Sequence, residues 1–182
     1  AVFVTDDTLG ITAIHSDALG YNSGAAYVYV RSNGKWTNQQ KLLASDGTTA
    51  DDFGYSITIS GETLVVGATN DNKANYPGAA YVYVRTNGEW TEQQKLTPAD
   101  GASKDNFALK LSLSNDTLAV AARDDDDKGL SSGAVYVFER KGESWTEQNK
   151  LVPNDGNAGD HFGYDVAIDG DRIVVGAPKN DD

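Results

Sequence analysis

The densest group of reactive side chains in the chain is a run of four carboxylates, Asp124, Asp125, Asp126 and Asp127, followed by Lys128. Neighbouring carboxylates can bind a cation or contact a positively charged partner, because their oxygen atoms are hard, negatively charged ligands. The same run can instead be a solvated acidic loop without a ligand. We favour the solvated loop and keep these four aspartates as candidate binding residues.

A second set of aspartates occurs three times along the chain. Each copy has an Asp-Gly pair followed by another Asp: Asp46-Gly47 with Asp51, Asp100-Gly101 with Asp105, and Asp155-Gly156 with Asp160. Asp side chains accept hydrogen bonds from nearby backbone N–H groups and are therefore typical of turns. We interpret these residues as turn formers, and carboxylates that share an ion are the alternative.

Groups that could catalyse a reaction are scarce. His15 and His161 are the only two histidines, there is no Cys, and neither a glycine-rich phosphate loop nor a nucleophile elbow is present. We therefore expect no enzymatic activity and no disulfide. The 27 acidic residues against 15 Lys and Arg give a net charge of −12. This charge argues against a nucleic-acid partner, whose binding depends on neutralising phosphates.

The candidate residues lie within an internal repeat. The segment that starts Gly24-Ala25-Ala26-Tyr27 returns from Gly78 and again, slightly changed, from Gly133, at offsets of 54 and 55 residues. The same two offsets separate two further markers, which are Trp36, Trp90 and Trp145, and Phe53-Gly54, Phe107-Ala108 and Phe162-Gly163. Repeats of this length indicate an array of similar structural units.

Each repeat contains four short apolar runs. In the second repeat these are residues 55–60, 64–68, 79–84 and 90–96, and Asn87-Gly88 predicts a hairpin turn before the last run. No run shows the apolar stripe of a helix. Four antiparallel strands per repeat are typical of a β-propeller blade, so we predict an all-β propeller. A β-sandwich or a solenoid is the alternative.

Several of these segments resemble the FG-GAP repeat. They are Phe53-Gly54-Tyr55-Ser56, Val65-Val66-Gly67-Ala68-Thr69, Gly78-Ala79-Ala80-Tyr81, and Phe162-Gly163 with Val174-Val175-Gly176-Ala177-Pro178. FG-GAP repeats build the seven-bladed propeller of integrin α-subunits and many other extracellular proteins. The third copy departs from the pattern with Phe107-Ala108 and Ala121-Ala122-Arg123, which suggests a degenerate blade of the same fold.

The repeat divides a single propeller segment, residues 1–182, into blades. Blade 1 covers residues 1–52, blade 2 residues 53–106, blade 3 residues 107–161, and a half blade residues 162–182. This is fewer blades than the roughly 4–8 of a closed propeller. We therefore expect the segment to be part of a larger ring of about seven blades, as in the family that it resembles. Further blades or another chain would complete that ring.

The resemblance also directs attention to calcium sites, because integrin propellers bind calcium in an Asp-rich loop between the first and second strands of a blade. Only Asp169 and Asp171 hint at that pattern, since the equivalent turns carry fewer carboxylates. We expect no cofactor, and we keep these two aspartates as candidate metal ligands. Asn115 begins the one glycosylation sequon, Asn115-Asp116-Thr117, and is the candidate glycosylation residue.

The resemblance implies a non-catalytic extracellular module for adhesion or interaction. Such a module would bind a protein or glycan through the loops at residues 15–24, 69–78 and 123–133, where Tyr21 and Tyr76 are candidate exposed contacts. The alternatives are a carbohydrate-binding propeller, a structural unit of an extracellular filament or surface protein, and a propeller beside an enzyme domain. We expect an extracellular or cell-surface location, although residues 1–5 do not resemble a signal peptide. No apolar stretch reaches the roughly 18 residues of a membrane span.

Overall fold

The computed structural model describes residues 1–69 and 76–180. The regular secondary structure in these ranges consists of β-strands alone. The first sheet contains β1 (Val2–Val4), β2 (Thr8–Ala13), β3 (Ala25–Ser32) and β4 (Lys35–Leu42). The second contains β5 (Phe53–Ser60), β6 (Thr63–Ala68), β7 (Ala79–Thr86) and β8 (Glu89–Leu96). The third contains β9 (Phe107–Ser114), β10 (Thr117–Ala122), β11 (Ala134–Lys141) and β12 (Ser144–Leu151). The last contains β13 (Asp165–Asp169) and β14 (Arg172–Gly176).

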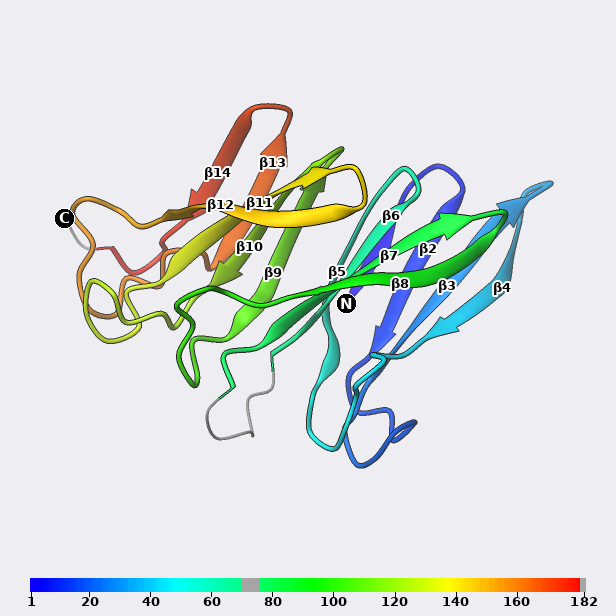
Figure 1. Ribbon diagram of the computed structural model, residues 1–182, viewed down its shortest axis with the longest axis horizontal. Coiled ribbons are helices and arrows are strands. Elements are labelled where there is room, and N and C mark those ends of the chain that lie inside the picture. Colours follow the sequence, from blue (N-terminus) through cyan, green and yellow to red (C-terminus); the bar gives the residue numbers. More distant parts are fainter. Residues whose placement is uncertain (70–75, 181–182) are drawn as a thin grey trace.

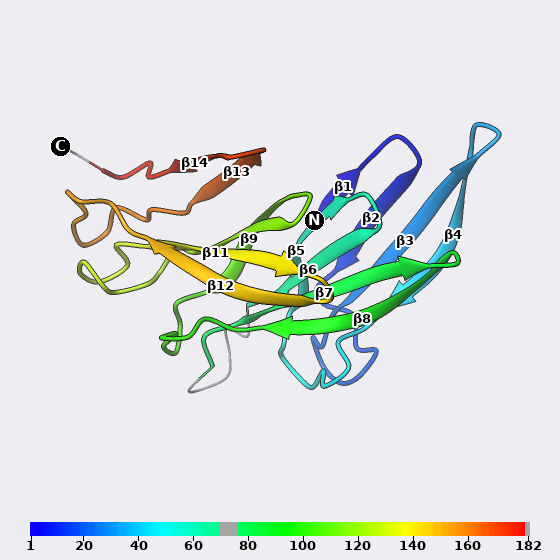
Figure 2. The same ribbon diagram turned by 45° about the horizontal axis from the view of Figure 1, so that its top comes forward.

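Each sheet is an antiparallel meander in which strands pair in chain order. The four sheets follow one another across the molecule, from blue to red in Figure 1, and keep that order in Figure 2. The first strands of successive sheets contact one another, as β5 does with β9 and β9 with β13. These are the blades of a propeller, and the expected all-β propeller fold is confirmed. The blades do not close into a ring within the described residues.

The middle strands of the blades are buried because blades stack face to face. All six residues of β6 are buried, whereas the first four residues of the outer strand β4 are exposed. One apolar cluster fills the space between the first and second blades, and another the space between the second and third. Continuous apolar runs such as residues 64–68 therefore face a neighbouring blade on both sides.

The repeated motif residues meet across the interfaces between blades. A Cβ atom on Gly24 would lie 2.0 Å from the carbonyl oxygen of Phe53, and one on Gly133 would lie 2.0 Å from that of Phe162. The Phe53 ring then packs edge-on against Tyr81 of its own blade, with ring centroids 5.5 Å apart. The glycine of one blade and the phenylalanine of the next thus recur together, because the backbone at the phenylalanine packs directly against the glycine and leaves no room for a side chain there.

The third blade keeps the strand order of the others although its glycine is replaced by Ala108. Ala108 has a φ of 67°, in the left-handed region that Gly54 and Gly163 also occupy at φ values of 102° and 88°. The repeated tryptophans differ in how far their side chains are exposed. Trp90 and Trp145 are buried against neighbouring blades, each 2% exposed, whereas Trp36 is 38% exposed.

Candidate functional site

One end of the stacked blades carries the long connections. The loops between the second and third strands of blades 1 and 3 lie there, together with the connections between blades at 43–52, 97–106 and 152–164. We call this end the loop face. The short turns within hairpins, such as Asn33-Gly34 and Asn87-Gly88, lie at the opposite end, the turn face. Residues 70–75 of the predicted binding loop 69–78 lie outside the described residues.

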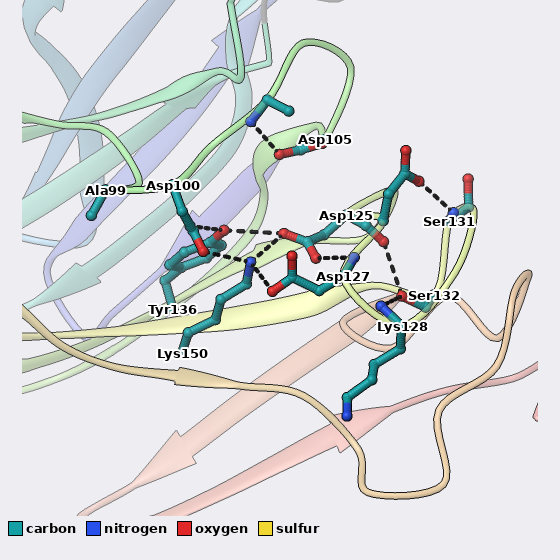
Figure 3. Close-up of polar contacts among 12 residues, drawn as sticks. Ala99, Asp100, Asp105, Asp125, Asp127, Lys128, Ser131, Ser132, Tyr136 and Lys150 are labelled. Carbon is teal, nitrogen blue, oxygen red and sulfur yellow. Dashed lines mark hydrogen bonds and ion pairs between the residues drawn. The ribbon is translucent and has the colours of Figure 1, made fainter.

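The centre of the loop face on blade 3 is the ammonium group of Lys150, which comes from β12. Lys150 Nζ lies 2.7 Å from Asp127 Oδ2, 2.8 Å from Asp125 Oδ2 and 3.0 Å from Asp100 Oδ2 (Figure 3). It also lies 5.0 Å from the centroid of the Tyr136 ring, a cation–π contact. Burial alone would lower the pKa of this ammonium, but hydrogen bonds to the surrounding carboxylates outweigh burial and raise the pKa. Lys150 is therefore a permanent cation inside the acidic cluster.

Asp125 is the buried member of that cluster, with a side chain 3% exposed. Its Oδ1 accepts the Asp127 N–H at 3.1 Å, and its Oδ2 accepts the Tyr136 hydroxyl at 3.1 Å. The interpretation of residues 124–127 as a solvated loop is thus wrong for Asp125. Its charge is compensated by Lys150 rather than by water, as burial of a charge requires.

Asp124 belongs to a separate network on the same loop. Its carboxylate accepts hydrogen bonds from Arg123 Nη2 at 2.8 Å and from Asn106 Nδ2 at 2.7 Å, and His161 Nδ1 lies 3.4 Å away. Burial raises the pKa of Asp124, but the hydrogen bonds from Arg123 and Asn106 outweigh it and bring the pKa below its ordinary value. This network ties the loop to the connections on both sides of blade 3.

The Asp-Gly segments have two separate roles. The later aspartate of each copy accepts the N–H three residues before it, as Asp105 does from Ala102 at 2.6 Å and Asp160 from Asn157 at 2.8 Å, so turn formation is confirmed for these residues. In the first two copies the earlier aspartate instead reaches the next blade. Asp46 accepts hydrogen bonds from Tyr81 Oη at 2.8 Å and Lys95 Nζ at 2.6 Å.

Asp100 repeats the contacts of Asp46 one blade further on. It accepts the Tyr136 hydroxyl at 2.8 Å as well as the Lys150 ammonium. Sequence reasoning missed both lysines as partners of these aspartates. The signal was available, because Lys95-Leu96 and Lys150-Leu151 recur in the same register as the two Asp-Gly pairs. Blade 3 adds Asp125 and Asp127 to these contacts, so its loop is held by two further ion pairs to Lys150.

The structure separates the other predicted residues into two groups. Tyr21 and Tyr76 lie on the loop face and are 69% and 40% exposed. Asp171 and Asn115 in turns, and Asp169 at the end of β13, are exposed on the opposite, turn face, away from the acidic loop. The structure therefore does not bring the candidate metal and glycosylation residues together with the candidate binding residues.

The calcium prediction receives no support from the arrangement of ligands. Asp169 and Asp171 flank Gly170 on a single turn, and two carboxylates supply fewer oxygens than the roughly 6–8 that Ca²⁺ takes. Across residues 1–69 and 76–180, no three His, Asp or Glu side chains are grouped so that they could hold a metal ion. Asp169 and Asp171 remain candidate metal ligands through the resemblance alone, and the expectation of no cofactor stays a prediction.

Comparison with known proteins identifies the repeat. The family model described as FG-GAP repeat matches residues 36–83, 90–138 and 145–182. No curated protein matches the chain. The described part of the structure contains no helix with the length and apolarity needed to cross a membrane. Each match spans the outer strand of one blade and the first strands of the next. Because the matched residues make up more than half of the sequence, the chain belongs to the FG-GAP repeat family.

Proposed function

We propose that the chain is a non-catalytic interaction module of an extracellular or cell-surface protein, and that its loop face binds the partner. The observation that carries this proposal is the loop at residues 123–133, which the three-carboxylate contact of Lys150 fixes in place. A fixed loop loses little conformational entropy on binding, so it is suited to recognition. FG-GAP repeats are typical of extracellular proteins, which supports the proposed location.

We also propose that the chain has no catalytic role. The groups on the loop face that could transfer protons, such as Asp124 and His161, are held in contacts with neighbouring side chains. A second candidate function is carbohydrate binding, favoured by the 69% exposure of the Tyr21 ring on a loop tip. Exposed aromatic rings can stack on the apolar faces of sugars.

The proposal is tested by measuring binding of the purified chain to arrays of extracellular proteins and of glycans. Any ligand found is then measured against Tyr21→Ser on the loop face and Asp171→Ala, an exposed residue on the turn face. A loop-face interaction module loses affinity with the first substitution and keeps it with the second. Ligands that respond only to Asp171→Ala would contradict the proposed face.

A further inference from the structure

His161 lies in the connection between blades 3 and 4, directly before Phe162. Its backbone is fixed, because its N–H donates to the Ser131 carbonyl at 3.2 Å and its C=O accepts the Tyr164 N–H at 3.0 Å. Its φ is 56°, in the left-handed region, and Asn106 has the same φ at the equivalent position of the preceding connection. The His161 side chain therefore starts from a fixed backbone, and it is only 16% exposed.

The two ring nitrogens of His161 face groups of opposite charge. Nε2 lies 3.0 Å from Lys179 Nζ, which belongs to the segment after β14. Nδ1 is buried and lies 3.4 Å from Asp124 Oδ1, which is longer than a good hydrogen bond. Burial raises the pKa of Asp124, but the hydrogen bonds from Arg123 and Asn106 outweigh it and bring the pKa below its ordinary value. Asp124 therefore stays negatively charged in mild acid.

The contact with Lys179 fixes where the ring carries its proton. An ammonium group has three donors and no acceptor, so Lys179 can donate to Nε2 only while that nitrogen keeps its lone pair. The His161 ring is then neutral, with its proton on Nδ1, which faces the Asp124 carboxylate. A second proton on the ring removes the acceptor and places two positive charges 3.0 Å apart. The same proton turns the Asp124 contact into a charge-assisted one, so protonation exchanges one neighbour for the other.

Two further carboxylates lie close to these groups. Asp160 is 2% exposed and accepts the Asn157 N–H at 2.8 Å, so its carboxylate is held within its own turn. Asp105 accepts the Asp124 N–H at 3.2 Å through its backbone carbonyl. Burial raises the pKa of the Asp105 carboxyl to about 6, within the range of pH in which a histidine also changes charge. An experiment on His161 must therefore separate these two groups.

We propose that His161 is a pH-sensitive latch, which holds residues 177–180 against the connection between blades 3 and 4 while its ring is neutral and releases them when the ring is protonated. Lys179 is exposed, so its ammonium is readily solvated once it leaves the ring. A second link between this segment and the connection is long, since Asn180 Nδ2 lies 3.5 Å from Asp160 Oδ2. The Lys179 contact is therefore the shorter of these two attachments.

The latch adds regulation to the loop face. In the repeat, residues 178–180 correspond to residues 123–125, the start of the acidic loop of blade 3. Mild acid would thus loosen the corresponding segment of the last blade. The latch can be observed without any ligand, so it stands apart from the proposed function.

Nuclear magnetic resonance of the whole chain tests the latch. At about pH 7.5, nitrogen-15 spectra of the imidazole should show the His161 proton on Nδ1. Backbone order parameters of Lys179 and Asn180 should then be near 0.85, and they should fall below about 0.6 at about pH 5.5. This fall should have the same midpoint as the His161 ring signals. His15, which is exposed on blade 1, is the reference histidine in the same spectra.

Three variants separate the latch from other causes. His161→Asn removes the titrating ring and keeps a residue that the equivalent Asn106 shows at the same φ, so the order of residues 177–180 should no longer depend on pH. Lys179→Met removes the neighbouring positive charge, so the His161 signals should titrate about half a pH unit higher or more. Asp105→Asn is the matched control, which keeps the ring and should leave the pH dependence of the segment in place.

Each of several results would overturn the latch. One is a segment whose order parameters are the same at both pH values, and another is a neutral ring that carries its proton on Nε2. A fall in order that persists in His161→Asn but disappears in Asp105→Asn would assign the pH dependence to the carboxyl group. None of these results bears on whether the loop face binds a partner, so the proposed function is tested separately.

Discussion

The carboxamide of Gln94 pairs with the backbone of Trp145 in the next blade, donating to its carbonyl at 2.9 Å and accepting its N–H at 2.8 Å. Gln40 makes the same two bonds with Trp90, at 2.7 and 2.8 Å. The pairing of the outer strand with the strand before it contains a bulge at this point. In the first blade, the register between β3 and β4 shifts between Val28 and Tyr29 of β3. A side-chain amide thus continues the hydrogen bonding of one outer strand into the next.

We predict that Gln94→Leu destabilises the protein by about 1–3 kcal/mol, because it leaves the N–H and C=O of Trp145 without partners at a buried interface. Urea unfolding followed by tryptophan fluorescence measures the loss. Gln148→Leu is the control, since Gln148 is exposed on β12 and its carboxamide donates hydrogen bonds to Thr146 of its own strand. Equal effects of the two substitutions would contradict the bridging role of Gln94.

Lys150→Met should be more damaging, with a loss of about 3–5 kcal/mol, because it leaves the buried Asp125 carboxylate without its cation. Lys95→Met removes the equivalent lysine of blade 2, whose carboxylate partner Asp46 is half exposed. The loss there should be smaller. Chemical unfolding of both variants tests the ranking, and a larger effect at Lys95 would contradict the account of the blade 3 cluster.

Asp105 should make stability depend on pH. Burial raises its pKa to about 6, and the charges of Asp125 and Asp126 act in the same direction, while Lys150 and the Ala102 N–H oppose it. Between about pH 4 and 6 the folded state therefore holds a proton that the unfolded state has lost, so this residue's contribution to stability falls as pH rises through that window.

Asp105→Asn keeps an oxygen to accept the Ala102 N–H but carries no charge. It should be more stable than the natural chain by on the order of 1–3 kcal/mol at pH 8, and the difference should shrink toward zero near pH 4. Unfolding free energies across this pH range provide the measurement. A difference that does not change with pH would show that Asp105 does not titrate in this way.

The packing of Gly133 against Phe162 is tested by a pair of alanine substitutions. Gly142→Ala carries only the cost of a left-handed alanine, about 1–2 kcal/mol, because its φ is 66° and nothing lies within 4 Å of the added Cβ. Gly133→Ala has a similar φ of 88° but places the Cβ 2.0 Å from the Phe162 carbonyl oxygen. It should cost at least a further 2 kcal/mol in thermal or chemical unfolding. Equal losses would mean that the blades can separate slightly at no cost.

The strands could be predicted from the sequence because the repeat and the alternation of apolar residues are local signals. The expected runs 64–68, 79–84 and 90–96 of the second repeat became β6, β7 and β8 with ends that differ by no more than two residues. Periodicity carried this information, and tertiary packing did not alter it.

The contacts of the acidic loop could not be predicted in the same way. Lys150 reaches Asp125 and Asp100 only because β12, the loop after β10 and the preceding connection meet at one end of blade 3. That meeting depends on how neighbouring blades stack, which no short segment encodes.

The most direct test of a loop face held ready for binding is amide hydrogen exchange across residues 123–133. In the natural chain the Asp127 and Gly133 amides, bonded to the Asp125 side chain and backbone, should be protected. In Lys150→Met they should exchange at least tenfold faster while β11 keeps its protection, and Lys95→Met should leave them unchanged. Equal protection of these amides in Lys150→Met and the natural chain would contradict the claim that Lys150 fixes the loop.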